Sequence, residues 1–88
     1  MNNAELTKSR IIQSASSSLG SSLQQTRRQL GFDLNTVMQN TNIPIPLIDH
    51  LELGLCHKLN LAVKLALFYN KEIRIELVEP EPDKHDIN

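Results

Sequence analysis

Aromatic residues and cysteine are scarce in this chain, and both absences narrow what the protein can be. The 88 residues include two Phe, one Tyr and no Trp, so a core has to be built mainly from Leu, Ile and Val. Cys56 is the single cysteine, so no disulfide can form within the chain, which fits a reducing cytosol. We therefore expect a cytoplasmic protein with an aliphatic core.

Long hydrophobic runs are also missing from the sequence. No stretch approaches the roughly 18 apolar residues that a membrane-spanning helix requires. The first residues are polar and do not have the apolar segment of a secretory signal. We expect a soluble protein without a membrane partner.

The sequence patterns of catalysis and metal binding are absent as well. No glycine-rich phosphate loop, paired carboxylates or nucleophile with a base occurs in a supporting context. Asp49 and His50 are neighbours, but adjacent residues on a helix do not face each other. Cys56 has His50 and His57 nearby, whereas a structural zinc site needs about four ligands with C-x-x-C type spacing. We predict neither an enzyme nor a cofactor.

The charged residues are unevenly distributed, although the formal net charge is only −1. Residues 4–71 hold seven Lys or Arg and four Asp or Glu, and are therefore mildly basic. Residues 72–88 hold six acids against Arg74 and Lys84. A basic body is compatible with DNA binding. A domain of this size buries only about 60% of its unfolded surface, so a partner chain would add stability.

Residues 31–54 carry the pattern on which the predicted fold rests. Apolar residues recur with helical spacing on both sides of a short break at Asn42. Asp33 is suited to cap the first helix, and Pro44 fits the first turn of the second. Asn42 can adopt the left-handed conformation that a tight turn requires. We predict two short helices joined at a steep angle, which is a helix-turn-helix.

Two flanking helices complete a predicted domain of residues 18–71. The predicted helices span residues 18–30, 34–41, 46–53 and 59–70. The first ends at Gly31, a residue type favoured just after a helix. Its inward-facing residues are predicted to be Leu19, Leu23, Thr26 and Leu30. The last is apolar nearly all round, so we expect part of it to meet another chain.

The order of these residues resembles the helix-turn-helix of the Xre family, the small repressors of the lambda and 434 phage type. The resemblance spans residues 19–70 and rests on Leu19, Leu23, Arg27, Gly31, Val37, Met38, Ile43, Ile48, Leu51, Glu52, Gly54, Leu59, Val63, Leu65 and Ala66. It implies a mainly α, lambda-repressor-like domain of about four helices that binds DNA. It also implies a structural ion pair between Arg27 and Glu52, which leaves Arg28 as the better candidate for a phosphate contact.

In this family the start of the third helix enters the major groove of DNA. The matching positions, with one neighbour, are Pro44, Ile45, Pro46, Leu47 and His50. Only His50 can hydrogen-bond to a base edge, while Ile45 and Leu47 could touch a thymine methyl group. Leu34 stands where the family often has a glutamine that holds a phosphate. The candidates for backbone contacts are Arg28, His57 and Lys58.

Because few of these side chains can read bases, the sequence also allows a second prediction, a domain that binds protein. Some helix-turn-helix domains of this shape bind a protein partner rather than DNA. The apolar edge of residues 44–47 would suit a protein contact, or it could pack on the N-terminal arm of the same chain. That arm, residues 1–17, is predicted to be partly helical or mobile, with minor-groove contacts by Lys8 and Arg10 as the alternative.

Residues 72–79 alternate between polar and apolar side chains, which predicts a β-strand. Ile73, Ile75 and Leu77 would share one face. The chain offers no second strand, so we predict pairing with the same strand of a second copy across a twofold axis. The apolar face would then lie on the last helix, near Phe68 and Tyr69. The alternative is a tail that is disordered or packed on its own chain.

A strand after the last helix resembles antitoxins of the HipB type, in which such a strand builds the dimer. The resemblance implies an autoregulating homodimeric repressor with a palindromic DNA operator and a kinase-type toxin as possible second partner. Residues 80–88 are acidic and twice interrupted by proline, so we predict a disordered tail, with docking on a partner protein as the alternative.

Overall fold

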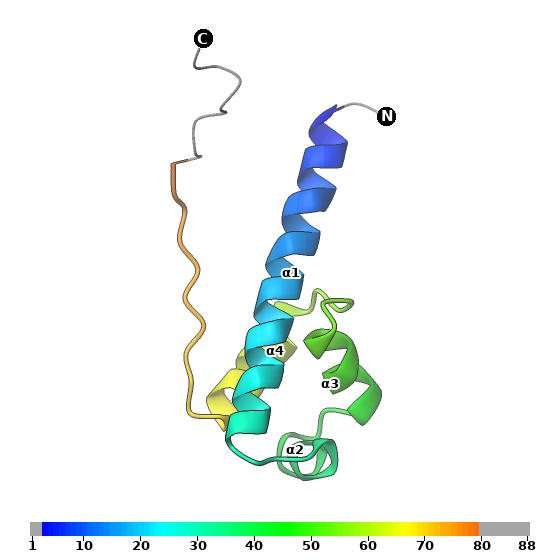
Figure 1. The fold of residues 1–88 in the computed structure, drawn as a ribbon, viewed down its shortest axis with the longest axis vertical. Coiled ribbons are helices and arrows are strands. Elements are labelled where there is room, and N and C mark those ends of the chain that lie inside the picture. Colours follow the sequence, from blue (N-terminus) through cyan, green and yellow to red (C-terminus); the bar gives the residue numbers. More distant parts are fainter. Residues whose placement is uncertain (1–2, 80–88) are drawn as a thin grey trace.

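The computed structural model describes residues 3–79, which form four helices and an extended C-terminal segment (Figure 1). The helices are α1 (Asn3–Gln29), α2 (Leu34–Thr41), α3 (Ile45–Glu52) and α4 (Leu59–Phe68). The mainly α class with four helices is confirmed. No strand forms within residues 3–79, and the predicted acidic tail at 80–88 lies outside the described residues.

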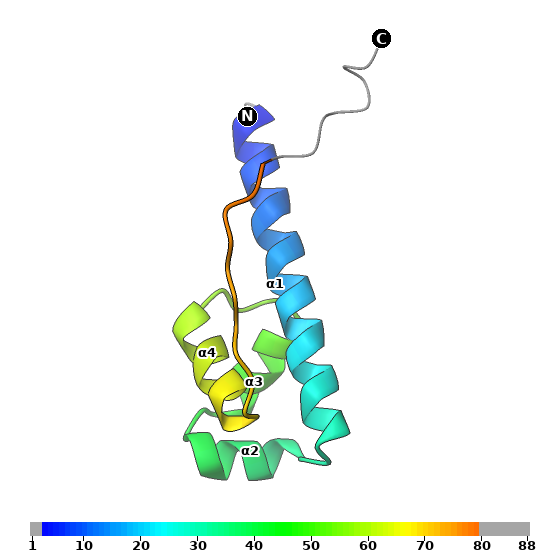
Figure 2. The same ribbon diagram turned by 90° about the vertical axis from the view of Figure 1, so that its left-hand side faces the viewer.

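Helix α1 is much longer than predicted. It begins at Asn3 rather than Ser18, so the predicted boundary between arm and domain falls inside a continuous helix. Serine costs only about 0.5 kcal/mol relative to alanine in a helix, and a helix nucleated by packing at one end extends one hydrogen bond at a time. The N-terminal half of α1 therefore projects beyond the body of the molecule (Figures 1 and 2).

The end of α1 differs from the prediction in one side chain. The Leu30 amide donates to the Thr26 carbonyl oxygen at 3.0 Å, and Gly31 follows with a φ of 76°, as expected of a residue just after a helix. Leu30, however, is 46% exposed and does not face inward as predicted. The chain turns away toward α2 at this point, so no element covers Leu30.

Helix α2 has the predicted bounds because both of its ends are capped. The Asp33 carboxylate accepts a hydrogen bond from the Thr36 amide at 2.7 Å. At the other end, Asn42 adopts a left-handed conformation with a φ of 61°, and its amide donates to the Met38 carbonyl oxygen at 2.8 Å. These two polar residues determine where the helix starts and where the chain turns.

Helix α3 begins one residue earlier than predicted, at Ile45. Pro44 precedes the helix instead of sitting in its first turn, and its carbonyl oxygen accepts hydrogen bonds from the amides of Leu47 and Ile48. Pro46 takes the place in the first turn, where a missing N–H costs nothing. Helix α3 ends at Glu52 and helix α4 at Phe68, each slightly before the predicted residue.

The core is aliphatic with one aromatic cluster at its base. Buried residues come from all four helices, the α2–α3 turn and the residue after α4: Leu23, Val37, Ile43, Ile48, Leu51, Ala62, Leu65, Ala66 and Tyr69. The two Phe and the single Tyr of the chain stack together, with ring centroids 5.3 Å apart for Phe32 and Phe68 and 6.3 Å apart for Phe32 and Tyr69. Tyr69 is only 3% exposed, so it lies in the core rather than at the dimer contact we predicted.

Residues 71–79 run back alongside the body, antiparallel to α1 (Figures 1 and 2). The Lys71 amide donates to the Ala66 carbonyl oxygen at 2.7 Å, which closes the end of α4. Ile73 packs partly against the core, whereas Ile75 is 69% exposed and Leu77 is fully exposed. The predicted pairing of this segment with a second copy stays a prediction, because the structure holds one chain.

Candidate nucleic-acid interface

The α2–turn–α3 unit is built from two capped helices whose inner faces are tied to the core. In the turn, the Thr41 hydroxyl donates to the Val37 carbonyl oxygen at 2.8 Å and accepts from the Ile43 amide at 3.2 Å. Because Thr41 and Ile43 are buried, these contacts fix the turn against the core. The unit therefore presents the outer face of α3 in a defined orientation.

The outer face of α3 carries few groups that can read bases. Pro46 and His50 are exposed, and Asp49 adds an exposed acid beside them. Pro44 is exposed just before the helix, and Ile45 is half-buried. His50 is thus the one predicted base-reading residue with hydrogen-bonding atoms, and the acid next to it would oppose a nearby phosphate.

Two of the predicted contact residues face the protein instead of solvent. Leu47 and Leu34 are half-buried and pack against the core cluster. Leu34 occupies the start of α2, so the phosphate contact that a polar side chain could make from this position is missing. Ile45 is the better placed of the two candidates for a thymine methyl contact.

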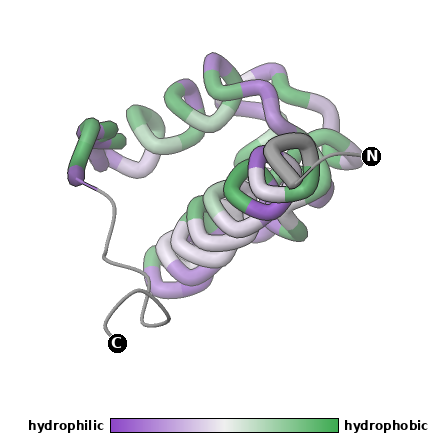
Figure 3. Tube along the Cα trace, turned by 90° about the horizontal axis from the view of Figure 1, so that it is seen from above, coloured by the Kyte–Doolittle hydropathy of each residue, from purple (hydrophilic) through white to green (hydrophobic). Residues whose placement is uncertain are grey.

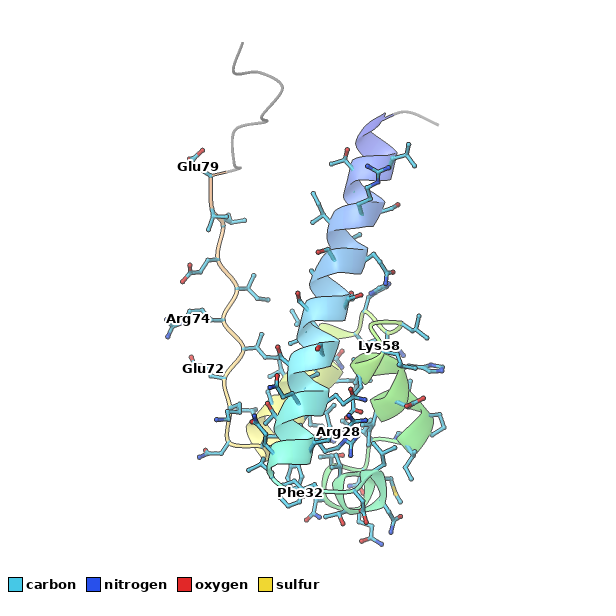
Figure 4. All side chains as sticks on the ribbon, viewed as in Figure 1. Arg28, Phe32, Lys58, Glu72, Arg74 and Glu79 are labelled. Carbon is cyan, nitrogen blue, oxygen red and sulfur yellow. The ribbon has the colours of Figure 1, made fainter. Side chains whose placement is uncertain are left out.

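The candidate phosphate-binding residues lie on both sides of the α2–α3 unit along the chain. Arg28 is exposed near the end of α1, and Lys58 is exposed in the linker between α3 and α4 (Figure 4). His57 is exposed beside Lys58, but its Nδ1 atom lies 2.6 Å from the Ser16 hydroxyl of α1. Only its Nε2 atom is left for a further hydrogen bond, so Arg28 and Lys58 are the stronger candidates.

Arg27 and Glu52 form the ion pair expected from the resemblance. Arg27 donates from Nε to Oε2 of Glu52 at 2.7 Å and from Nη2 to Oε1 at 3.0 Å, which is a two-pronged contact. The two side chains are 11% and 1% exposed. The hydrogen bond with Glu52 raises the pKa of the Arg27 guanidinium, against the opposing effect of burial. The pair fixes the end of α3 to α1 and has no free face for DNA.

Three contacts that support the interface carry no clear sequence signal. Arg27 also donates from Nη1 to the Phe32 carbonyl oxygen at 3.0 Å, which holds the connection between α1 and α2. Ser16 binds His57 across 41 residues of sequence. Gly20 lies so close to the end of α3 that an added Cβ would lie 2.7 Å from the Glu52 carbonyl oxygen. Gly20 itself is the one sequence signal for these contacts, since a glycine inside a helix often permits the close approach of another backbone.

The cap of α2 depends on the ionisation of Asp33. Hydrogen bonds from Thr36 lower the pKa of the Asp33 carboxyl below its usual value. Such a group stabilises the fold above its unfolded pKa, and that contribution is lost as the pH falls through the lowered folded pKa. The α2–α3 unit is therefore expected to weaken under acidic conditions.

Three absences complete the description. Within residues 3–79, no group of three or more His, Cys, Asp or Glu side chains is placed to hold a metal ion. No helix in the described part of the chain is long and apolar enough to cross a membrane. Comparison with protein-family models, curated proteins and solved structures finds no match for this chain.

Proposed function

We propose that this protein is a dimeric DNA-binding repressor. The observation that carries the proposal is the α2–turn–α3 unit, whose helix α3 exposes its outer face and is anchored at its end by the buried Glu52. Arg28 and Lys58 are exposed, and neither takes part in an ion pair within residues 3–79. A helix presented in this way fits the major groove of DNA, with cations beside it to bind phosphates.

In the proposed complex the start of α3 enters the major groove. His50 would hydrogen-bond to a base edge and Ile45 would contact a thymine methyl group. Most of the affinity would come from contacts with the DNA backbone, since α3 offers little else for base readout. We therefore expect modest sequence specificity for a single copy of the domain.

A homodimer would supply the specificity that one copy lacks. Residues 72–79 make no backbone–backbone hydrogen bond within the described chain, so their donors and acceptors are free to pair with a second copy. Helix α4 also exposes an apolar stripe of Leu59, Val63 and Leu67. A twofold dimer would place two α3 helices about 34 Å apart on a palindromic operator.

The biological setting follows from the resemblance to HipB-type antitoxins. We propose that the dimer represses its own promoter and that a kinase-type toxin is its second partner. The described residues carry no separate toxin-binding motif, so this step rests on the analogy alone.

The test is fluorescence anisotropy of the full chain with its own upstream promoter DNA, titrated with salt and competed with random duplex. We expect binding that resists competitor and weakens steeply with salt. Association that random duplex abolishes at equal concentration would contradict a repressor function.

Replacement of single cations sharpens this test and is our first specific prediction. Arg28→Gln and Lys58→Gln should each reduce the slope of log affinity against log salt by about one, because each removes one phosphate contact. Lys64→Gln on α4 is the matched control and should leave the slope unchanged. An unchanged slope in the first two variants would remove both residues from the interface.

The second candidate function is an adaptor that binds a protein through the same surface. It is favoured by the apolar edge of residues 44–47, where Pro44 and Pro46 are exposed and none of the four side chains carries a forked hydrogen-bonding group. An Ile45→Lys variant separates the two functions. It should preserve or increase DNA affinity if the edge lies near DNA, and should abolish capture of a partner if the edge binds protein.

A further inference from the structure

A cleft of about 490 Å³ lies between α1, the start of α4 and the extended segment. Its lining consists of Ala15, Ser16, Ser18, Leu19, Ser22, Leu23, Leu51, Cys56, His57, Lys58, Leu59, Ala62, Ile73, Arg74 and Ile75. Its volume falls in the range of pockets that hold small ligands. None of the proposed DNA-reading residues of α3 contributes to it, and its overlap with the candidate DNA interface is limited to the phosphate-contact candidates His57 and Lys58.

The serine-rich middle of α1 creates the space. Ala15, Ser18, Leu19 and Ser22 follow one another at helical spacing, so they share the face of α1 that lines the cleft. The small serine and alanine side chains keep α1 from filling the space in front of α4, and Figure 3 shows pale turns of intermediate hydropathy along α1. The serine-rich stretch of α1, which has only moderate helix propensity, thus forms one wall of the cleft.

The opposite walls are apolar. Ala62 and Leu51 belong to the buried core, and Leu59 is 44% exposed on the side of α4. Ile73 and Ile75 close the cleft from the extended segment. A ligand with an apolar body would remove this surface from water and gain the corresponding hydrophobic free energy.

The ionisable groups of the lining give the cleft one sign of charge. The basic ones are Lys58, Arg74 and His57, the only other ionisable side chain is that of Cys56, and the lining contains no Asp or Glu. Figure 4 shows Arg74 directed away from α1, so Lys58 and His57 are the groups at the α1 side of the cleft. His57 already contacts Ser16 through Nδ1, which leaves Nε2 for a ligand. Such an edge complements a single anionic group next to an apolar body.

We propose that this cleft binds a small carboxylic acid with a flexible apolar chain, of the size of a medium-chain fatty acid. The chain would lie between α1 and the two isoleucines of the extended segment, and the carboxylate would lie at Lys58 and His57. The proposal goes beyond DNA binding and does not depend on it.

The test uses the full chain and sodium decanoate below its aggregation concentration. Isothermal titration calorimetry should show saturable binding at one site per chain. Two-dimensional ¹H–¹⁵N spectra should show shifts confined to amides of residues 15–23, 56–62 and 73–75. Decanol, which has the same chain without the charge, should bind at least about five-fold more weakly, as expected for one exposed ion pair.

Two matched pairs of variants locate the ligand. Ser22→Leu fills the cleft and should abolish binding, while Ser21→Leu, which lies outside the lining, should not. Lys58→Gln should weaken binding about five-fold, and Lys64→Gln should leave it unchanged. Should Ser22→Leu fail to give a folded spectrum, Ser18→Leu fills the same space from an exposed position.

Several results would overturn the proposal. One is the absence of saturable decanoate binding by a folded sample, and another is a set of shifts away from the cleft. If decanol bound as tightly as decanoate, and Lys58→Gln left decanoate binding unchanged, the proposed contact between the carboxylate and Lys58 would be refuted. Contacts from a second copy to the cleft residues in a mixed-label sample, undiminished by decanoate, would show that the partner chain occupies this space instead.

Discussion

The side chain of Arg27 connects three parts of the molecule. It extends from α1, pairs with Glu52 at the end of α3 and reaches the Phe32 carbonyl oxygen before α2. Both partners are largely removed from water, so the pair is stable only while each charge has its counterpart. The orientation of α3 depends on this contact more than on any residue of α3 that faces solvent.

Removal of Arg27 should therefore act on stability. We predict that Arg27→Ala lowers the free energy of unfolding by about 3 kcal/mol, because it leaves Glu52 charged and buried without its partner. Arg27→Lys should recover only part of the loss, since lysine cannot make the two-pronged contact. Thermal and urea denaturation measure the change, with Arg28→Ala as the control. A loss of DNA affinity with unchanged stability would contradict the structural role.

Tyr69 places a hydroxyl group in the core without a partner. Its oxygen is buried and has no hydrogen bond to any described residue. Burial raises the pKa of the Tyr69 phenol to about 12, from an ordinary value of 10.0. Since the folded pKa lies above the unfolded one, the neutral phenol contributes stability below pH 10 that is lost as the pH rises toward 12.

Tyr69→Phe should stabilise the protein. It keeps the ring that stacks on Phe32 and Phe68 and removes an unsatisfied hydroxyl, so we expect a gain of about 1 kcal/mol at pH 7. The advantage over the unaltered protein should grow between pH 10 and 12, because the Tyr69 phenol ionises there in the unfolded chain and a phenylalanine side chain does not. Urea denaturation at several pH values tests this. A destabilised variant would mean that the hydroxyl has a partner after all.

At the scale of elements, α1 and α3 approach each other unusually closely. Gly20 faces the end of α3, where an added Cβ would meet the carbonyl oxygens of Leu51 and Glu52. Nearby, Gly54 packs against the backbone of Ser17. Both obstacles are backbone atoms, which cannot rotate away. The contact sets the distance between the long helix and the candidate DNA-reading helix.

Gly20→Ala should destabilise the protein despite the better helix propensity of alanine. Forcing the two backbones apart should cost about 2 kcal/mol, more than the roughly 1 kcal/mol that alanine gains over glycine inside a helix. Ser21→Ala, at the exposed neighbouring position, should be neutral or slightly stabilising. The melting temperatures of both variants test this prediction. An increase for Gly20→Ala would show that the fold does not require the close approach of α1 and α3.

At the scale of the whole molecule, two features extend beyond the four-helix body. The N-terminal half of α1 projects on one side, and residues 71–79 run back beside it (Figures 1 and 2). Leu77 and Val78 are largely or fully exposed on the extended segment. Exposed apolar side chains on a segment with unpaired backbone are typical of a surface that another chain covers.

The extended segment should decide the oligomeric state. We predict that a chain ending at residue 71 is monomeric or unstable, whereas a chain ending at residue 79 forms the proposed dimer, because only the latter keeps the pairing segment. Sedimentation velocity over a range of concentrations distinguishes these states. A stable dimer of the shorter chain would place the interface elsewhere, with the α4 stripe of Leu59, Val63 and Leu67 as the next candidate.

The sequence by itself determined the parts of this fold that rest on local chemistry. Asp33 and Asn42 set the ends of α2 because an acceptor side chain caps a helix start and asparagine tolerates a left-handed turn. The spacing of apolar residues predicted the helices of the body and most of the core. Resemblance, rather than spacing, supplied the pairing of Arg27 with Glu52.

Tertiary structure decided what depends on distant contacts. The length of α1, the burial of Tyr69, the hydrogen bond of Ser16 with His57 and the cleft all arise from residues that packing brings together. Local sequence patterns report propensity and periodicity over a few turns, and they carry no information about which surface meets which. The exposed serines of α1 could be recognised as the wall of a cleft only once α4 and residues 73–75 were placed opposite them.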